Sequence, residues 1–551
     1  MQDFSKFKMP YPIAKKYDKS VAYFSMEFGI DQALKIYSGG LGYLAGSHMR
    51  SAYDLKQNLV GIGILWKYGY YDQIRKPNNE MDALFQEKQY NFLHDTGITF
   101  DIQVHNANVK VKAWYLAPET FGTAPMFLLS TDLKENDYLS RTICHRLYSN
   151  NVETKIAQSI LLGKGGARLL ELMNFEPEIY HLNEAHALPA AFHLYEKLGN
   201  LEAVKARTVF TTHTPVEAGN EKHSVHLLDK MSFFGNLSME KMREITQVDG
   251  GVFNHSLVAL RMAKIANGVS KMHGEVSRLM WKDYEGICPI THITNSQNHK
   301  YWHDPALDKA IKSKKNDALI ERKIELKKEL FDIVADQTGK IFDPEVLTVV
   351  WARRFAAYKR ADLITRDLER FERIINNSKK PIQIIWSGKP YPMDYGAVEM
   401  FNQLIHLSKK YPNLAVVTGY ELSLSKALKQ GSDVWLNNPR VPREASGTSG
   451  MTSAMNASVN LSTADGWIPE FAEHGENSFI IPAADLNKTI PDQDQHDYDH
   501  LWSLIENTIV PLYYDEPKKW LTIVKNSMKD VLPAFGANRM AAEYYERLFV
   551  D

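Results

Sequence analysis

Short, nearly continuous apolar runs alternate with amphipathic stretches along the whole chain. The runs are rich in β-branched and aromatic residues, and they occupy residues 21–28, 179–182, 207–212, 347–352, 382–387 and 414–419. Runs of roughly four to eight such residues are typical of parallel strands, because a parallel sheet is buried on both faces. We therefore predict a strand at each of these places.

Helical patterns lie between the predicted strands. The stretch 318–330 has apolar residues at 318, 319, 320, 324, 326 and 330, and most of its charged residues fall on the other face of a helix. Strand–helix alternation over such a length predicts a doubly wound α/β fold. We expect two Rossmann-like domains that face each other across a cleft and bind ligands at the carboxyl ends of their strands.

The length of 551 residues suits about three to four average domains or, equally well, two large α/β domains. The charged helix predicted around 317–336 precedes a strand and is the best candidate for an interdomain junction. We place the boundary near residue 300, which gives an N-terminal domain at 1–300 and a C-terminal domain at 301–525. Residues 526–551 are predicted to form an amphipathic helix that could pack back across the domains.

Charge and composition exclude several classes of protein. The 65 basic and 66 acidic residues give a formal net charge of −1, which argues against a nucleic-acid binder or a polybasic membrane protein. Cys144 and Cys288 are too few for a disulfide framework and too far apart for a zinc ribbon. The start has no apolar signal core, and the longest apolar run, 59–66, is far shorter than the roughly 20 residues of a membrane span. We expect a soluble, cytoplasmic protein with no membrane or nucleic-acid partner and no metal.

Four cations follow the predicted strand at 347–352, namely Arg353, Arg354, Lys359 and Arg360. Arginine offers a planar fork that binds two phosphate oxygens, and lysine adds a compact charge on a flexible stem. At the carboxyl end of a parallel strand these side chains would point into the cleft. The alternative is a solvated charged loop.

A second candidate lies further along, where Glu444 precedes a run of small residues. Small residues with free amides ahead of a helix can hold an anion, and a carboxylate can accept hydrogen bonds from sugar hydroxyls. The run Ser38–Gly42 could serve another anion in the same way, although a structural turn or a packed loop explains either run equally well. No nucleophile triad or carboxylate pair competes with these motifs, so they favour phosphate or phosphosugar chemistry.

These motifs resemble the glycogen and α-glucan phosphorylase family in its short bacterial form. The similarity covers nearly the whole chain, through YFSMEFG (23–29), YSGGLGYLAG (37–46), HLNEAH (181–186), FTTHTPVEAG (210–219), ANGVSKMHGEVSR (266–278), ARRFAAYKR (352–360), SGKPYPMD (387–394), DVWLNNPR (433–440), EASGTSGM (444–451) and DGW (465–467). The resemblance implies a GT-B fold and retaining transfer of α-1,4-linked glucose to and from phosphate. It also implies that 1–300 is the glucan side and 301–525 the phosphate side.

The resemblance assigns roles to residues of the predicted N-terminal domain. Gly39, Gly40 and Leu41 match the glycine loop next to the donor phosphate. His213 is similar to the histidine whose main chain lies near the anomeric carbon, and Asn295 matches a partner of the sugar hydroxyls.

The resemblance likewise assigns residues of the C-terminal domain. Glu444 matches a second sugar-hydroxyl partner, and Arg354 and Lys359 match the family's phosphate clamp. Arg353 stands where many relatives have lysine. The substrate-binding loop is expected to include Ser446, Gly447, Thr448 and Gly450.

One position departs from the family pattern. The family anchors pyridoxal phosphate (PLP) on a lysine directly after the methionine that closes the small-residue loop, but here Met451 is followed by Thr452. A hydroxyl group cannot form the imine, so covalent PLP at Thr452 is excluded. Two nearby family glycines are also replaced, by Ser296 and Ala457, and added side chains reshape a pocket. Non-covalent PLP or a nucleotide diphosphate remains compatible with the motifs.

Three functions stay open at this point. The first is phosphorolysis of an α-glucan with loose or absent PLP, the second is a retaining glucosyltransferase with a nucleotide-sugar donor, and the third is an inactive glucan-binding relative. The joint presence of a phosphate clamp and sugar-binding residues argues against the third. The expected partners are an α-glucan or oligosaccharide with phosphate and glucose 1-phosphate, or a nucleotide sugar, and a homodimer is left open.

Overall fold

The structure is a computed structural model that describes residues 3–550 and divides into two compact units. The first unit comprises the chain up to Tyr71, Phe85–Asn295 and the chain from Ala537 onward, and the second comprises Asp72–Leu84 and Ser296–Gly536. Each unit is α/β with a mainly parallel sheet, so the predicted fold class is confirmed. The domain ranges expected from the sequence stay a prediction, because packing into two compact units does not show that each unit folds independently.

The first unit is built on a nine-stranded sheet. Its strands, in spatial order, are β13 (Ile290–His292), β12 (Ile265–Gly268), β9 (Thr208–Thr211), β8 (Ile179–Asn183), β1 (Val21–Phe24), β2 (Leu59–Ile64), β7 (Met126–Ser130), β6 (Ala107–Leu116) and β5 (His94–Val104). All neighbouring pairs are parallel except β7–β6 and β6–β5. The order reverses between β1 and β8, which are adjacent in space but far apart in the chain.

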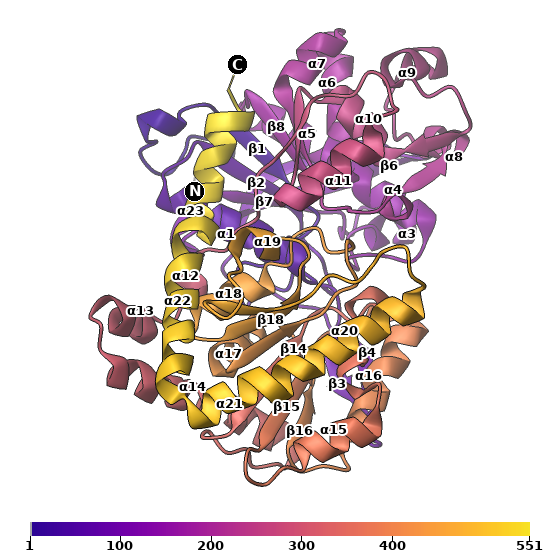
Figure 1. Ribbon diagram of the computed structural model, residues 1–551. Helices are drawn as coiled ribbons and strands as arrows, with labels where there is room; N and C mark the ends of the chain where they lie inside the picture. The colour runs from indigo at the N-terminus through magenta and orange to yellow at the C-terminus, as the bar shows by residue number, and fades with distance from the viewer. Residues whose placement is uncertain (1–2, 551) are drawn as a thin grey trace. The chain divides into compact units, whose positions relative to one another are not determined.

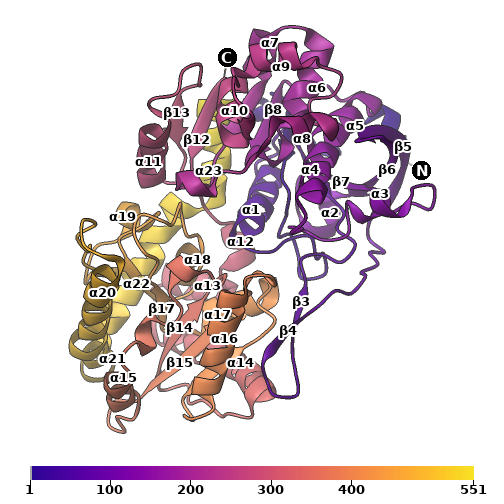
Figure 2. The same cartoon turned by 90° about the vertical axis from the view of Figure 1, so that its right-hand side faces the viewer.

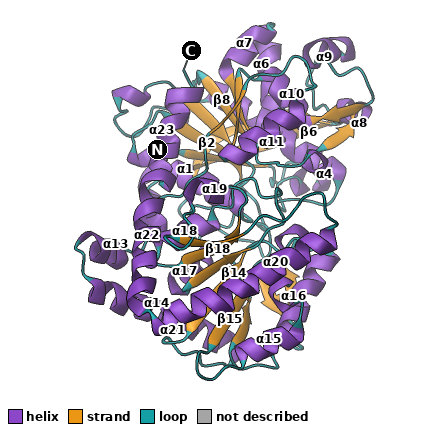
Figure 3. Ribbon diagram, viewed as in Figure 1, coloured by secondary structure: helices purple, strands orange, loops and turns teal. Residues whose placement is uncertain are grey.

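Helices pack against both faces of this sheet (Figure 3). The helices of this unit are α1 (Gly40–Asp54), α2 (Pro118–Phe121), α3 (Tyr138–Thr142), α4 (Val152–Ile160), α5 (Gly166–Leu172), α6 (Pro189–Leu198), α7 (Leu201–Arg207), α8 (Val225–Lys230), α9 (Met239–Thr246), α10 (His255–Met262), α11 (Lys271–Trp281) and α23 (Ala537–Glu543). A separate two-stranded antiparallel sheet of β10 (Lys222–Ser224) and β11 (Val252–Asn254) completes the unit. The last of these helices, α23, packs on α1.

The second unit has a six-stranded, entirely parallel sheet. Its spatial order is β16 (Leu414–Val417), β15 (Ile382–Ser387), β14 (Leu347–Ala352), β17 (Val434–Asn437), β18 (Val459–Thr463) and β19 (Ser478–Ile481). This is the strand order of the Rossmann fold, with its reversal between β14 and β17. The hairpin of β3 (Asp72–Arg75) and β4 (Met81–Leu84) packs on helix α16 (Tyr395–Ser408) of this unit (Figure 2).

The helices of the second unit can be followed in Figure 1. They are α12 (His299–Trp302), α13 (Pro305–Lys312), α14 (Asn316–Thr338), α15 (Leu368–Ile375), α16 (Tyr395–Ser408), α17 (Leu422–Gly431), α18 (Ser449–Met455), α19 (Ile468–Phe471), α20 (Ile490–Leu504), α21 (Val510–Asp515) and α22 (Pro517–Phe535). Helices α14 and α17 pack together on the sheet, and their shared core contains Leu330, Val334, Val350, Leu428 and Trp435. Among the described helices, none has the length and apolarity that crossing a bilayer requires.

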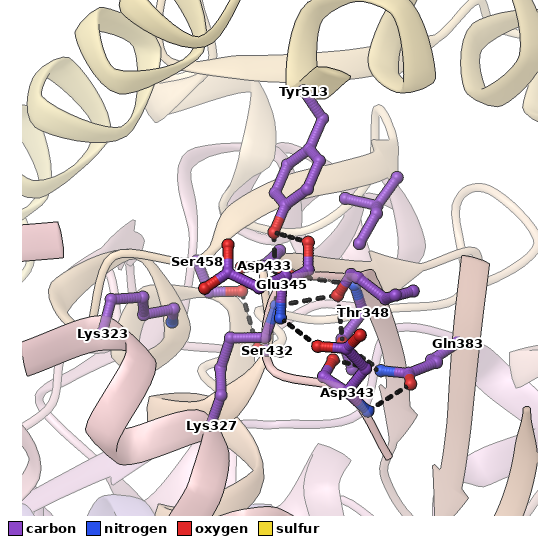
Figure 4. A network of polar contacts seen from close by, with 12 residues as sticks. Lys323, Lys327, Asp343, Glu345, Thr348, Gln383, Ser432, Asp433, Ser458 and Tyr513 are labelled. Atoms are coloured by element: carbon purple, nitrogen blue, oxygen red, sulfur yellow. Dashed lines mark hydrogen bonds and ion pairs between the residues drawn. The ribbon is translucent and has the colours of Figure 1, made fainter. Parts of the chain in front are cut away.

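The buried face of α14 differs from the predicted one. Ile320, which the pattern placed in the apolar stripe, is 46% exposed, whereas Lys323 and Lys327 are buried. The ammonium group of Lys327 pairs with the buried Asp433 at 2.5 Å (Figure 4). Because the long lysine stem packs like an apolar chain while its amine reaches polar partners, the helix buries two positions that the hydrophobic pattern assigned to water.

Candidate active site

In the second unit, the strand order brings two predicted motifs together. Strands β14 and β17 are neighbours although β15 and β16 separate them in the sequence. The cationic loop follows β14, and the loop that carries Glu444 follows β17. Ligands of such sheets bind at the carboxyl ends of the strands where the order reverses, which is the place of both loops.

The centre of this site is a carboxylate held by two cations. Glu444 Oε2 lies 3.1 Å from Lys359 Nζ and 3.4 Å from Arg353 Nη1, and all three side chains are largely buried. Burial alone would raise the pKa of Glu444, but the charges of Lys359 and Arg353 hold that pKa below its ordinary value. Burial lowers the pKa of Lys359 to about 8, against the attraction of Glu444. The trio carries one net positive charge when Lys359 is protonated, which suits an anion.

The other two cations of the loop lie elsewhere. Arg354, assigned to the clamp by the resemblance, has an exposed side chain, whereas the adjacent Arg353 is buried against Glu444. Arg360 donates to the carbonyls of Asn438 and Pro439 and pairs with Asp497 at 2.7 Å. Arg360 therefore ties the loop after β14 to the loop after β17.

The small-residue loop supplies further donors. Ser446 Oγ and Arg353 Nε are buried, and neither has a hydrogen-bond partner among residues 3–550. Gly447 adopts a φ of +85°, a conformation that favours glycine. Thr448 precedes α18, and a Cβ added to Gly450 would lie 2.5 Å from Asn460 Oδ1. Buried donors without partners beside a cationic cluster fit the oxygens of a phosphate group.

Thr452 lies inside α18 and is completely buried. Its hydroxyl donates to the Ser449 carbonyl at 3.0 Å. The donor set described above fits the phosphate end of PLP, but residue 452 offers no amine to its aldehyde end. No described residues gather into a cluster of His, Cys, Asp or Glu side chains that could hold a metal ion.

Asp465 holds the main chain of Glu444 in place, and it was not among the site residues expected from the sequence. Its carboxylate accepts the backbone N–H groups of Glu444 and Gly466, each at 2.9 Å. Burial and the nearby Glu444 charge raise the pKa of Asp465 to about 7, although the backbone hydrogen bonds oppose this. The signal available in the sequence was the DGW motif, which was used only for the family resemblance.

In the first unit, the glycine loop is held by the chain's own carboxylate. Glu27 follows β1, and its Oε2 accepts the backbone N–H groups of Ser38 at 2.5 Å and Gly39 at 3.1 Å. The amides of Gly40 and Leu41 lie in the first turn of α1, where no helical carbonyl accepts them. A Cβ added to Gly39 or Gly40 would meet no atom of residues 3–550 within 4 Å, so there is open space beside the start of α1. Glu27 was not among the predicted residues.

His213 follows β9, the neighbour of β8. Its Nε2 lies 2.7 Å from Asn183 Oδ1, and its backbone N–H donates to Glu184. Burial lowers the pKa of His213 to about 3, so the imidazole is neutral near neutral pH. Burial also raises the pKa of Glu184, a residue with a φ of +69° that entered the sequence analysis only within the HLNEAH motif.

Asn295 ends the first unit and is 3% exposed. Its backbone N–H donates to the Val269 carbonyl at 2.9 Å, which fixes the residue beside β12. Its side-chain Oδ1 has no partner among the described residues. A buried amide oxygen without a partner fits a hydroxyl donor such as a sugar.

Comparison with known proteins finds relatives over nearly the whole chain. A profile of the carbohydrate phosphorylase family matches residues 290–508. The chain is 33% identical to the maltodextrin phosphorylase of Thermococcus litoralis, over 98% of this chain and 72% of the relative. It is 30% identical to a glycogen phosphorylase of Mycobacterium tuberculosis, over 96% and 70%, and 46% identical to an uncharacterized protein of Methanocaldococcus jannaschii, over 96% and 100%. With its parallel α/β sheets of the GT-B type, the chain belongs to the glycogen phosphorylase family.

Proposed function

We propose that the protein is a retaining α-glucan phosphorylase, which transfers glucose between an α-1,4-glucan and phosphate. The observation that carries this proposal is the Glu444 carboxylate held by Lys359 and Arg353 at the strand-order reversal of the second unit. Cations there suit phosphate, and a carboxylate oxygen suits a sugar hydroxyl. The maltodextrin and glycogen phosphorylases among the relatives support the same substrate class.

In this proposal the chain acts mainly by positioning and by charge stabilisation. Lys359, Arg353 and Arg354 bind phosphate oxygens, with the donors of the small-residue loop beside them. Glu444 accepts sugar hydroxyl protons, and Asn295 offers its amide oxygen to another hydroxyl. In the first unit, the amides at the start of α1 are assigned to phosphate and the main chain at His213 to the reacting sugar.

PLP enters this proposal through the family. Lys359, Arg353 and Ser446 would contact its phosphate as well as the substrate phosphate, because these groups form the buried donor set of the second unit. When bound, the group supplies a phosphate beside the substrate phosphate. A nucleotide diphosphate would instead supply two linked phosphates, which is the basis of the nucleotide-sugar alternative.

The test is an assay of phosphate release from glucose 1-phosphate with a maltooligosaccharide acceptor, with and without added PLP. A parallel assay replaces glucose 1-phosphate by nucleoside diphosphate glucose. Phosphate release in the first assay is the expected result. Transfer only from the nucleotide sugar would overturn the proposal in favour of the alternative, and no transfer in either assay would favour an inactive relative.

Two variants test the clamp within the same assay. Arg354→Ala and Lys359→Ala should each raise the activation free energy of the chemical step by roughly 3–4 kcal/mol, the loss expected for one preorganised charge-stabilising group. Near-normal turnover of Arg354→Ala would remove this exposed arginine from the clamp and leave the role to Arg353.

A further inference from the structure

The hairpin of β3 and β4 carries a buried polar side chain that has no part in the site described above. Gln73 lies on β3 and is 6% exposed. Its Nε2 donates to the carbonyl of Gly388 at 3.0 Å, and its Oε1 accepts the backbone N–H of Gly419 at 3.0 Å. A carboxamide offers a donor and an acceptor on one planar group, which is what a carbonyl and an N–H together require. Gln73 therefore joins the segments that follow β15 and β16.

The segment after β15 supports the main chain on both sides of Arg354. Gly388 directly follows β15, which is the neighbour of β14 in the sheet. The backbone N–H of Arg353 donates to the Ser387 carbonyl at 3.2 Å, and that of Phe355 donates to the Lys389 carbonyl at 3.4 Å. The residue that Gln73 holds thus lies between the two carbonyls that hold the start of the cationic loop.

The two segments are packed main chain against main chain. Gly388 has a φ of +151°, and a Cβ added there would lie 1.9 Å from the carbonyl oxygen of Arg353. Because such packing leaves no free space, a shift of one segment displaces the other. Arg353 is the residue whose Nη1 lies 3.4 Å from Glu444 Oε2. A continuous path of contacts therefore runs from Gln73 through Gly388 to the Arg353–Glu444 pair.

A role for Gln73 in attaching the hairpin alone is the alternative. The hairpin has another buried polar contact of that simpler kind, in which the backbone N–H of Met81 donates to Asn402 Oδ1 at 3.0 Å. Asn402 is 8% exposed and lies within α16, not in a segment at the carboxyl end of a strand. The two contacts allow attachment of the hairpin to be separated from support of Arg353.

We propose that Gln73 is a positioning residue for the anion site of the second unit. By fixing the Gly388 carbonyl, it holds the main chain of Arg353 so that the guanidinium stays beside Glu444. The inference rests on the proposed function only in naming phosphate as the anion, because the path of contacts from Gln73 to Arg353 is a property of the fold.

Hydrogen exchange followed by mass spectrometry tests the support of the loop in the full-length protein. Gln73→Met fills a similar volume without either hydrogen bond, so peptides that cover residues 353–359 should exchange about tenfold faster, the scale of one lost buried hydrogen bond. Asn402→Leu is the matched control, since it removes the other hairpin contact and should leave exchange at 353–359 unchanged.

Steady-state kinetics of phosphorolysis test the consequence for the site. Gln73→Met should raise the KM for phosphate about tenfold and leave the KM for the maltooligosaccharide near the parent value, because the misplaced group is the arginine of the clamp. Asn402→Leu should change neither KM, although thermal melting should show that both variants lose stability. A role in stability alone predicts the same KM values for both variants.

Unchanged exchange at 353–359 in Gln73→Met, or an equal change in Asn402→Leu, overturns the inference whether or not the protein is a phosphorylase. Faster exchange with a normal KM for phosphate also overturns it. If the parent protein has no phosphorolytic activity, the proposed function fails, and calorimetric titration with inorganic phosphate decides the inference instead. Weaker phosphate binding by Gln73→Met than by the parent then supports it, and equal binding or no binding overturns it.

A second variant covers the case in which Gln73→Met does not fold. Gln73→Glu keeps the shape of the side chain and the acceptor for Gly419, but when ionised it has no donor for the Gly388 carbonyl. It should therefore show the same faster exchange at 353–359 and the same rise in the KM for phosphate, and parent-like values for both would overturn the inference.

Discussion

The substitution Asp465→Asn removes the ionisable group of this side chain and keeps its shape nearly unchanged. Asp465 is 1% exposed and accepts two backbone N–H groups, and its pKa is raised from 3.8 to about 7. Between these two values the folded protein holds a proton that the unfolded chain has released. The free energy of unfolding should therefore fall as the pH rises from about 4 to 7, and remain reduced above that.

The magnitude follows from the two pKa values. Raising the pH from about 5 to about 8 should reduce the free energy of unfolding by roughly 3 kcal/mol through Asp465 alone. Asparagine does not titrate, so the variant should lose this part of the pH dependence. Its amide can accept only one of the two N–H groups well, which costs about 1 kcal/mol at every pH.

Denaturant unfolding followed by tryptophan fluorescence measures the free energy of unfolding at both pH values, in the parent protein and in Asp465→Asn. Taking the difference between proteins cancels the contribution of other titrating groups. Infrared spectroscopy adds a direct readout, a protonated-carboxyl band that the parent protein loses near pH 7 and the variant lacks. Equal pH dependence in the two proteins, with no difference in that band, would refute the assigned protonation of Asp465.

Two further predictions concern the close packing at Gly42 and the buried ion pair between Lys327 and Asp433. Gly42→Ala should destabilise the fold by about 1–3 kcal/mol, because the added Cβ would lie 2.7 Å from Tyr37 Cβ, while Gly40→Ala, whose Cβ meets open space, should leave the melting temperature nearly unchanged. Lys327→Met should cost about 3–5 kcal/mol in urea unfolding, because it leaves a buried aspartate without its cation. The exposed Lys328→Met is its control, and equal losses in the two lysine variants would contradict the role of the buried pair.

Several strands were predictable almost to the residue. The runs 347–352 and 382–387 coincide with β14 and β15, and residues 207–212 contain β9. These strands are buried on both faces, so their apolar runs have clear ends. The run 21–28 was predicted too long, because β1 ends at Phe24 and the chain then turns into the loop that carries Glu27.

The face of α14 was not predictable from hydrophobicity. Lys323 and Lys327 are buried because their amines reach carbonyls and a carboxylate from distant segments of the chain. Ile320 was assigned to the core, but it lies exposed. A pattern along one helix cannot reveal polar partners that other helices and strands supply.

The sequence by itself determined the α/β class, the family and the absence of an amine at Thr452, because these depend on residue identity and local order. The tertiary structure decided which residues meet. It buried Arg353 against Glu444 and left Arg354 exposed, and it placed Glu27 on the glycine loop. Each of these contacts joins segments far apart in the chain or depends on the direction of a side chain in a loop, and neither is encoded by a local repeat.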